Sequence, residues 1–268
     1  NGMWYFCGKP LQDAHKLGVA DVEEIIAHSS NIGAAKIGIE MGPERLYGYL
    51  TKFGFGARTG ISLPGESPGI SHPVKKWNGL SISRIPMGQG ISTTPLQMLM
   101  AMSAIANDGL LMKPIVVSRL VDRNGTVVAH NDPMPVRQII SPSTAHEMVK
   151  ALKAVVSTNG TGAKAAMPFY TVAGKTGTAQ KAIGGQYAHG KYFSSFIGFF
   201  PADDPELCIS VVLDAPDPKK GYYGAEVAIP VFRNIAERAA RYLAIPMEKQ
   251  PPQTAPKDLA LNATKTLN

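Results

Sequence analysis

Three β-rich segments near the C-terminal end place the strongest constraint on how this chain folds. They span roughly residues 170–180, 192–200 and 206–214, and only the sequence PADDPE separates the second from the third. So short a connection joins antiparallel strands, because a parallel pair needs a crossover of a dozen or more residues. The sequence GAEVAIPVFRNIAERAARYLA follows and predicts a long helix. An antiparallel sheet covered by a helix indicates an α+β domain.

Helical patterns dominate the part of the chain before this sheet. The sequence ADVEEIIAHSSN predicts a helix capped by Asp21, and the pattern breaks at Ser29-Ser30-Asn31 before it resumes in IGAAKIGIEM. Proline-first starts and capping residues predict further helices over about residues 43–54, 95–107 and 142–157.

Two segments within this region are not helical in pattern. Residues 54–92 are rich in Gly, Pro and Ser and predict a long ordered loop, a feature that is often functional in a compact domain. The sequence VVSRLVDRNGTVVAH predicts a β-hairpin with a type I′ turn at Asn124-Gly125.

We expect a single domain over residues 1–246. Its hydrophobic content of 44% with 18% charged residues is typical of a globular protein. The domain is expected to consist of a largely helical region over about 1–160 and the sheet with its terminal helix over about 168–245. Residues 247–268 are rich in Pro, Lys and Thr and are expected to form a disordered tail.

Charge and cysteine content weigh against several classes of function. The net charge of +7 suits an anionic partner, but the Lys and Arg residues are scattered, so nucleic-acid binding is disfavoured. Cys7 and Cys208 form no ligand cluster, so no metal site is expected. No cofactor is expected either, since the Gly-Lys-Thr at 174–176 has Phe169 where a phosphate-binding loop needs glycine. The apolar stretch at 96–106 is too short to cross a bilayer.

The sequence TVAGKTGTAQ combines β character with a lysine and two glycines. As a strand, it places Thr176 and Thr178 on one face and Lys175 and Gly177 on the other. Two hydroxyls on one face can both donate to a carboxylate, while the glycine lets another extended chain lie close. Backbone N–H groups on an unpaired edge can hold a peptide and a developing oxyanion. An ordinary edge strand protected by a lysine explains the same composition.

The break at Ser29-Ser30-Asn31 is the second candidate site. A loop at this point would present a hydroxyl and an amide together. A helix end followed by the N-cap of the next helix explains the same residues.

Together, the SSN and KTGT sequences resemble those of the serine acyl-transferases that react with penicillin. IPMGQGISTTPLQM, YTVAGKTGTAQK, SSFIGFFPADDPEL and GYYGAEVAIPVF are all similar to class B penicillin-binding proteins, in particular the cell-division D,D-transpeptidases. The likeness covers Val19 to Pro246. It implies the transpeptidase fold shared with serine β-lactamases, and a domain that cross-links peptidoglycan stem peptides ending in D-Ala-D-Ala through a serine acyl-enzyme, which β-lactams also form.

The resemblance also implies a place in the cell and a set of site residues. The domain would face the periplasm, anchored to the inner membrane by an upstream segment, with division-machinery proteins as partners. Three residues would be catalytic: Ser29, Asn31 and Lys175. Five would bind substrate: Thr176, Gly177, Thr178, Tyr222 and Tyr223. For the two tyrosines, covering the edge of the core is an equally good explanation.

The roles implied for these residues are specific. Ser29 would relay a proton, and Lys175 would tune the hydroxyl of Ser29 electrostatically. Asn31 would bond the substrate's amide. The hydroxyls of the KTGT strand would bind the terminal carboxylate, and the N–H of Thr178 would form half of the oxyanion hole.

The Ser-x-x-Lys pair, which supplies the nucleophile and base in this family, is missing. No serine in the 268 residues has a lysine three positions later. In the family this pair precedes the SSN sequence by some dozens of residues, so we expect a chain that is incomplete at its N-terminus and inactive alone. A degenerate relative is the other explanation. A serine β-lactamase, or a non-catalytic penicillin-binding sensor or scaffold, would share the remaining motifs.

Overall fold

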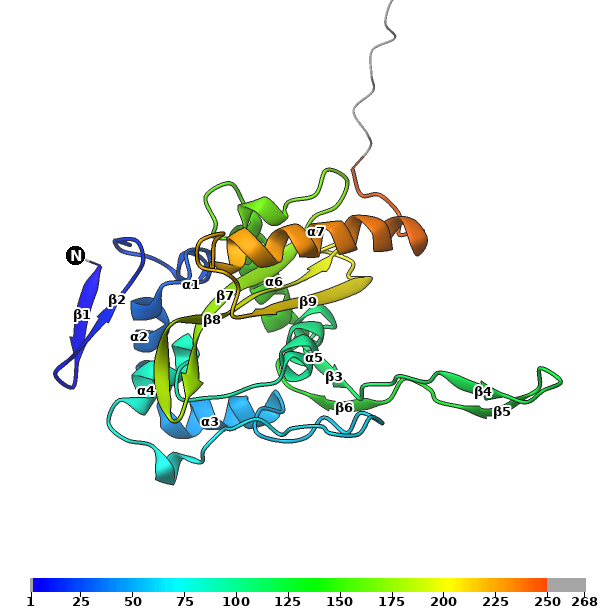
Figure 1. The fold of residues 1–268 in the computed structure, drawn as a ribbon, viewed down its shortest axis with the longest axis horizontal. Coiled ribbons are helices and arrows are strands. Elements are labelled where there is room, and N and C mark those ends of the chain that lie inside the picture. The colour runs from blue at the N-terminus through cyan, green and yellow to red at the C-terminus, as the bar shows by residue number, and fades with distance from the viewer. Residues whose placement is uncertain (1, 250–268) are drawn as a thin grey trace, which may run out of the picture.

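A three-stranded antiparallel sheet forms the centre of the fold (Figure 1). The structure is a computed structural model and describes residues 2–249 of the chain. The sheet has the order β7-β8-β9, with bounds Ala173–Ile183, Gln186–Phe200 and Leu207–Asp214. The antiparallel connection expected through PADDPE is confirmed, because β8 and β9 pair on either side of it.

Helices cover both faces of this sheet. Helix α7 (Gly224–Tyr242) packs on one face, while α5 (Pro95–Ala106) and α6 (Pro142–Val156) pack on the other (Figure 1). Two helical layers around an antiparallel sheet confirm the α+β prediction.

The apolar run at the end of β8 follows from this double cover. A strand buried on both faces needs apolar residues at successive positions rather than at alternate ones. Phe196 points toward α7, where its ring centroid lies 4.7 Å from that of Phe232. Ile197 and Phe199 point to the opposite face and pack with residues of α5 and α6.

The part of the chain before α5 contains more regular structure than the sequence predicted. The elements are β1 (Met3–Phe6), β2 (Lys9–Gln12), α1 (Val22–Ala27), α2 (Asn31–Met41), α3 (Pro43–Lys52), the 3₁₀ helix η1 (Val74–Lys76), α4 (Ser81–Arg84) and the 3₁₀ helix η2 (Ile85–Met87). The hairpin of β1 and β2 was not predicted, because most of its residues are exposed and its apolar pattern is weak. The predicted loop at 54–92 holds η1, α4 and η2, so it is less irregular than expected.

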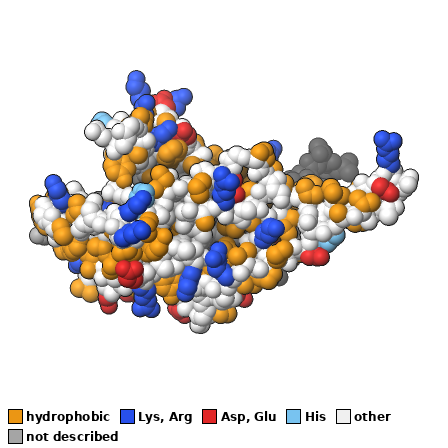
Figure 2. Space-filling model, turned by 90° about the horizontal axis from the view of Figure 1, so that it is seen from below, with side chains coloured by type: hydrophobic (Ala, Val, Ile, Leu, Met, Phe, Trp, Pro, Cys, Tyr) orange, Lys and Arg blue, Asp and Glu red, His pale blue; other side chains and the backbone are white. Residues whose placement is uncertain are grey.

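An extended arm projects from the body after α5 (Figure 1). Strand β3 (Leu110–Met112) pairs with β6 (Pro135–Gln138), and β4 (Arg119–Val121) pairs with β5 (Val127–His130). Hydrophobic side chains lie exposed along this arm, at the right of Figure 2.

The tip of the arm corrects one prediction. A type I′ turn needs positive φ at both central residues, yet only Gly125, at +83°, has it, and Asn124 does not. The Asp122 carboxylate accepts the N–H groups of Asn124 and Thr126, each at 2.8 Å, and so stabilises a wider turn instead.

The chain beyond α7 stays close to the sheet as far as it is described. The backbone N–H groups of Glu248 and Lys249 both donate to the Phe169 carbonyl, at 3.1 and 3.2 Å. The rest of the predicted tail, residues 250–268, lies outside the described residues. The domain limits therefore remain a prediction.

Replacing Phe232 by alanine should lower the free energy of unfolding by about 3–5 kcal/mol, because the ring is fully buried against Phe196. Urea denaturation followed by circular dichroism measures the change. Val231→Ala is the matched control on the same helix, since Val231 is 41% exposed, and it should change stability by about 0.5 kcal/mol or less. Equal losses in the two variants would contradict the packing described for α7.

Candidate functional site

The joint between α1 and α2 presents Ser29 at the surface. Ser29 is exposed and has a φ of +55°, a left-handed conformation that is uncommon for residues other than glycine. The next residue, Ser30, is the N-cap of α2, and its Oγ accepts the N–H of Gly33 at 2.9 Å. The predicted break in the helical pattern is confirmed. Its physical cause is the left-handed residue followed by a cap.

A buried carboxylate from the loop after β2 holds the joint between α1 and α2 in place. Asp13 accepts the hydroxyl of Ser30 at 2.7 Å and the N–H of Ile32 at 3.0 Å. A carboxylate at this position also complements the positive end of the α2 dipole. The side-chain amide of Asn31 donates to the carbonyl of Gln12, the last residue of β2, at 3.0 Å, so the end of this strand orients Asn31.

Lys175 of strand β7 contacts the joint between α1 and α2. The Lys175 ammonium donates to Ser29 Oγ at 2.8 Å and to the Thr176 carbonyl at 3.1 Å. Burial lowers the pKa of Lys175 from 10.5 to about 8, because an ammonium is poorly solvated there. An amine of this kind exchanges a proton readily near neutral pH, which suits it to polarise the Ser29 hydroxyl.

The two threonines of β7 lie on the opposite face of the strand from Lys175. Lys175 pairs with Ile197, which faces α5 and α6, whereas Thr176 pairs with Phe196, which faces α7. Thr178 Oγ1 accepts the N–H of Gly224, the first residue of α7, at 3.1 Å. The face assignment made from the sequence is therefore confirmed.

The edge position of β7 also agrees with the sequence analysis. Among the described strands, β7 pairs only with β8, so its other edge is open. Gly177 lies directly opposite Ser195 of β8. A Cβ at this position would lie 2.5 Å from Ser195 Oγ on β8, so the close contact is within the sheet.

Tyr222 and Tyr223 stand next to this strand as part of a stack of three tyrosines. The Tyr222 ring lies 4.5 Å from that of Tyr192 and 4.4 Å from that of Tyr223. Tyr222 donates a hydrogen bond to the Tyr223 hydroxyl, and this bond raises the pKa of Tyr222 to about 12. The Tyr222 carbonyl accepts the hydroxyl of Ser194, the β8 partner of Thr178, which ties the stack to the site strand.

Sequence reasoning missed three residues that the structure brings to the site. Asp13 gave no signal, because it lies in a polar loop 16 residues before Ser29. Tyr192 would have followed from the strand register, since it lies two residues before Ser194 on β8.

Thr161 lies between two glycines and donates to the Ala27 carbonyl while it accepts from Thr176.

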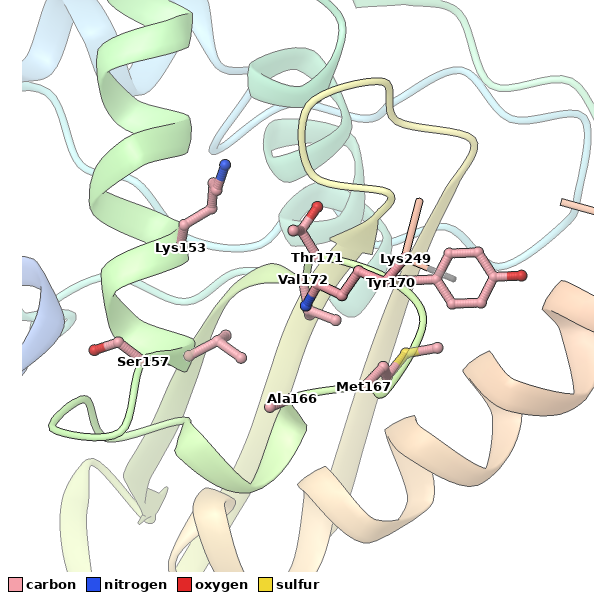
Figure 3. A pocket seen from close by; sticks show the side chains of 9 residues that line it. Lys153, Ser157, Ala166, Met167, Tyr170, Thr171, Val172 and Lys249 are labelled. Carbon is pink, nitrogen blue, oxygen red and sulfur yellow. The ribbon is translucent and has the colours of Figure 1, made fainter. Parts of the chain in front are cut away.

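Two hollows in the structure lie away from these residues. One of about 160 Å³ is lined by side chains that include Lys153, Thr171 and Lys249 (Figure 3). The other, of about 250 Å³, lies between the C-terminal end of α5, residues 146–150 of α6 and the PADDPE turn.

Residues 2–249 contain no group of three or more His, Cys, Asp or Glu side chains placed to hold a metal ion. Over the same residues, no helix combines the length and the apolar character that crossing a membrane requires.

The arrangement brings together groups for proton transfer and for anion binding. An exposed serine hydroxyl contacts a shielded amine, and an open strand edge beside them carries two further hydroxyls. Such a site could move a proton to or from a substrate held in extended form along β7.

Comparison with known proteins shows which family this chain resembles. Residues 7–237 match the model of the penicillin binding protein transpeptidase domain. The penicillin-binding protein PbpB of Mycolicibacterium smegmatis is 36% identical over 260 residues, which cover 93% of this chain and 40% of PbpB. The chain thus spans about two fifths of the length of this curated relative.

Two solved structures are similar over nearly the whole chain. The transpeptidase domain of penicillin-binding protein 3 from Burkholderia pseudomallei has a TM-score of 0.83 and 34% identity, covering 93% of this chain and 72% of that one. Penicillin-binding protein 3 from Mycobacterium tuberculosis, complexed with aztreonam, has a TM-score of 0.81 and 36% identity, covering 94% and 58%.

Replacing Lys175 by a residue without a charge should stabilise the fold at neutral pH. Between pH 8 and 10.5, the unfolded chain holds a proton on Lys175 that the folded chain has released, so stability rises with pH over this window. Below it, the buried ammonium costs at most about 3 kcal/mol. We expect Lys175→Met to raise the free energy of unfolding at pH 7 by up to that amount, and the gain to shrink as the pH approaches 10.5.

Urea denaturation at pH 7 and at pH 10 measures both effects. Lys164→Met is the control, because Lys164 is exposed in the nearby 3₁₀ helix η3 (Ala163–Ala165), and it should show neither effect. If Lys175→Met raises the free energy of unfolding equally at pH 7 and at pH 10, the ammonium of Lys175 is well solvated in the folded chain.

Proposed function

The chain belongs to the penicillin-binding protein transpeptidase family, and on that premise we propose that it forms part of a peptidoglycan D,D-transpeptidase domain. The substrate would be a stem peptide that ends in D-Ala-D-Ala. A serine would attack the peptide bond, release D-alanine, and pass the acyl group to an amine of a second strand. The observation that carries this proposal is the 2.8 Å contact between the Lys175 ammonium and Ser29 Oγ.

The nucleophilic serine would come from outside these 268 residues, because no Ser-x-x-Lys pair occurs within them. Ser29 would then pass a proton to the leaving amine of D-alanine, and later take one from the incoming amine. Lys175 would support both transfers, because an amine with a pKa of about 8 polarises the hydroxyl without binding its proton tightly.

The open edge of β7 would hold the substrate. An extended peptide can add to an unpaired strand edge through backbone hydrogen bonds, so the stem peptide would lie extended along β7. Its terminal carboxylate would reach the hydroxyls of the KTGT strand, and the N–H of Thr178 would contribute to the oxyanion hole. Asn31 would bond the substrate's amide, while Tyr222 and Tyr223 would wall the site beyond Thr178.

A β-lactam would acylate the same serine, and the aztreonam complex of the similar M. tuberculosis protein supports this. We also propose that the domain works in the periplasm, next to the inner membrane, held by an anchor upstream. Its partners would be proteins of the division machinery.

Mass spectrometry after incubation with benzylpenicillin tests the proposal. The 268-residue chain should gain no mass, because the nucleophile is not among its residues. The longer protein that carries this chain should gain the mass of one penicillin on a serine, and D-alanine should be released from a D-Ala-D-Ala peptide.

Other outcomes would contradict the proposal in distinct ways. A mass gain by the 268-residue chain would place a nucleophile within it. Steady hydrolysis of a chromogenic cephalosporin by the longer protein would indicate a β-lactamase. Reversible binding without an adduct would indicate a sensor or scaffold.

A further inference from the structure

The arm that projects after α5 carries a large share of the exposed apolar side chains (Figure 2). Nine large apolar side chains are exposed within the 22 residues from Ile115 to Val136, which is more than a third of those exposed in residues 2–249. Val116, Leu120 and Val128 are typical, with exposed fractions of 54%, 54% and 63%. Single apolar residues are common on a protein surface, but a cluster of this kind marks a contact surface.

The outer part of the arm is a two-stranded ribbon that is fixed at both ends. The Asp122 carboxylate closes the tip by accepting two backbone N–H groups. At the base, Asn131 donates its backbone N–H to the Ser118 carbonyl at 2.8 Å and its side-chain amide to the Val117 carbonyl at 2.7 Å. A ribbon that is already formed loses little conformational entropy when a partner binds to it.

Neither the faces nor the outer edges of this ribbon are covered. Every residue of β4 and β5 is exposed, and among the described strands each of the two pairs only with the other. The outer edge of β4 therefore presents backbone N–H and C=O groups with which a further strand can pair. Beside that edge, Val121 lies opposite Val127 and adds an exposed apolar pair.

The charged side chains of the arm are not balanced within it. Asp122 is engaged in the turn, and the carboxylate of Asp132 lies 3.0 Å from Nδ1 of His130. Four cationic side chains of the arm have no ionic partner among residues 2–249: Lys113, Arg119, Arg123 and Arg137. The arm thus uses both of its acids internally and leaves its cations for acidic groups from elsewhere.

These features favour a protein segment over a membrane or a second copy of the chain. Inside a lipid bilayer, the open strand edges would leave backbone groups without hydrogen-bond partners. In a pair of identical arms, the unpartnered cations of both copies would come together and repel one another. An extended segment with apolar and acidic side chains satisfies the open edge, the exposed aliphatic groups and the cations together.

We propose that the arm is a docking site for a partner protein, which adds an extended strand with apolar and acidic side chains to the outer edge of β4. Arg119 begins β4 and Arg123 lies two residues beyond its end, so acidic side chains of the added strand pair with both. The edge of β5 is less suited, because its His130 already has Asp132 as a partner. The inference does not depend on the proposed activity, since no residue of that site belongs to the arm.

Fluorescence anisotropy with a labelled peptide of alternating valine and glutamate tests recognition by the longer protein that carries this chain. The peptide should bind, and added salt should weaken binding because exposed ion pairs are screened. A peptide with lysine in place of glutamate should bind at least about tenfold more weakly. In the complex, the amides of β4 should exchange their hydrogens more slowly, because new strand hydrogen bonds protect them.

Three results of this measurement contradict the proposal. They are a lack of binding, equal binding of the two peptides, and protection of β5 without protection of β4.

Charge reversal tests the two arginines directly. Arg119→Glu combined with Arg123→Glu should weaken peptide binding about tenfold or more. Arg119→Gln combined with Arg123→Gln is the milder variant and should weaken it about threefold. The control is Lys164→Glu combined with Arg238→Glu, which changes the net charge equally at exposed positions outside the arm and should alter binding by less than about twofold. Equal losses in the arm variant and the control would mean that only the overall charge matters, and the docking site would be rejected.

Photo-crosslinking in the cells that make the longer protein identifies the natural partner. A photo-reactive amino acid at Val121 should form an adduct with a protein segment that contains acidic residues, and Arg119→Glu with Arg123→Glu should abolish this adduct. The same amino acid at Val231, which is also exposed but lies on α7, should not form it. The proposal fails if Val121 forms no adduct, if it reacts only with lipid or with a second copy of the protein, or if charge reversal leaves the adduct unchanged.

Discussion

The hydrogen bond between Lys175 and Ser29 is the contact around which the site is organised. It joins residues 146 positions apart, at a distance of 2.8 Å between Nζ and Oγ. It forms only if an edge strand and a joint between two helices are held at a fixed separation. Asp13 fixes the joint by accepting the hydroxyl of Ser30, and the helices packed on both faces fix the sheet.

The contact between Lys175 and Ser29 carries two costs in folding stability. Partial burial lowers the pKa of Lys175 to about 8, so its ammonium is expected to destabilise the fold at neutral pH, and Ser29 adopts a left-handed conformation that its side chain disfavours. The large apolar core offsets both costs, with Phe196 and Phe232 packed between the sheet and α7. The strained and desolvated groups lie at the open edge of the sheet.

Identical residues acquire different chemistry from their surroundings in this site. Thr176 and Thr178 share a face of β7, yet one faces a chain of acceptors that ends at a carbonyl, and the other faces a backbone N–H. The close approach of α7 creates this difference. At Gly224 a Cβ would lie 2.3 Å from the Ser195 carbonyl, so only glycine lets the helix terminus come near enough to bond Thr178.

The sequence by itself determined the local features of this protein. The hydrophobic periodicity predicted the longer helices and the central sheet, and its interruption at Ser29 predicted the break between α1 and α2. The alternation of side chains along a strand predicted which faces of β7 carry Lys175 and Thr176. Only the tertiary structure decided which groups meet: Asp13 under Ser30, Thr161 beside Thr176, and Tyr192 in the stack. The physical reason is that periodicity reports the side on which a residue lies, whereas hydrogen bonds between distant segments depend on how the packed elements approach one another.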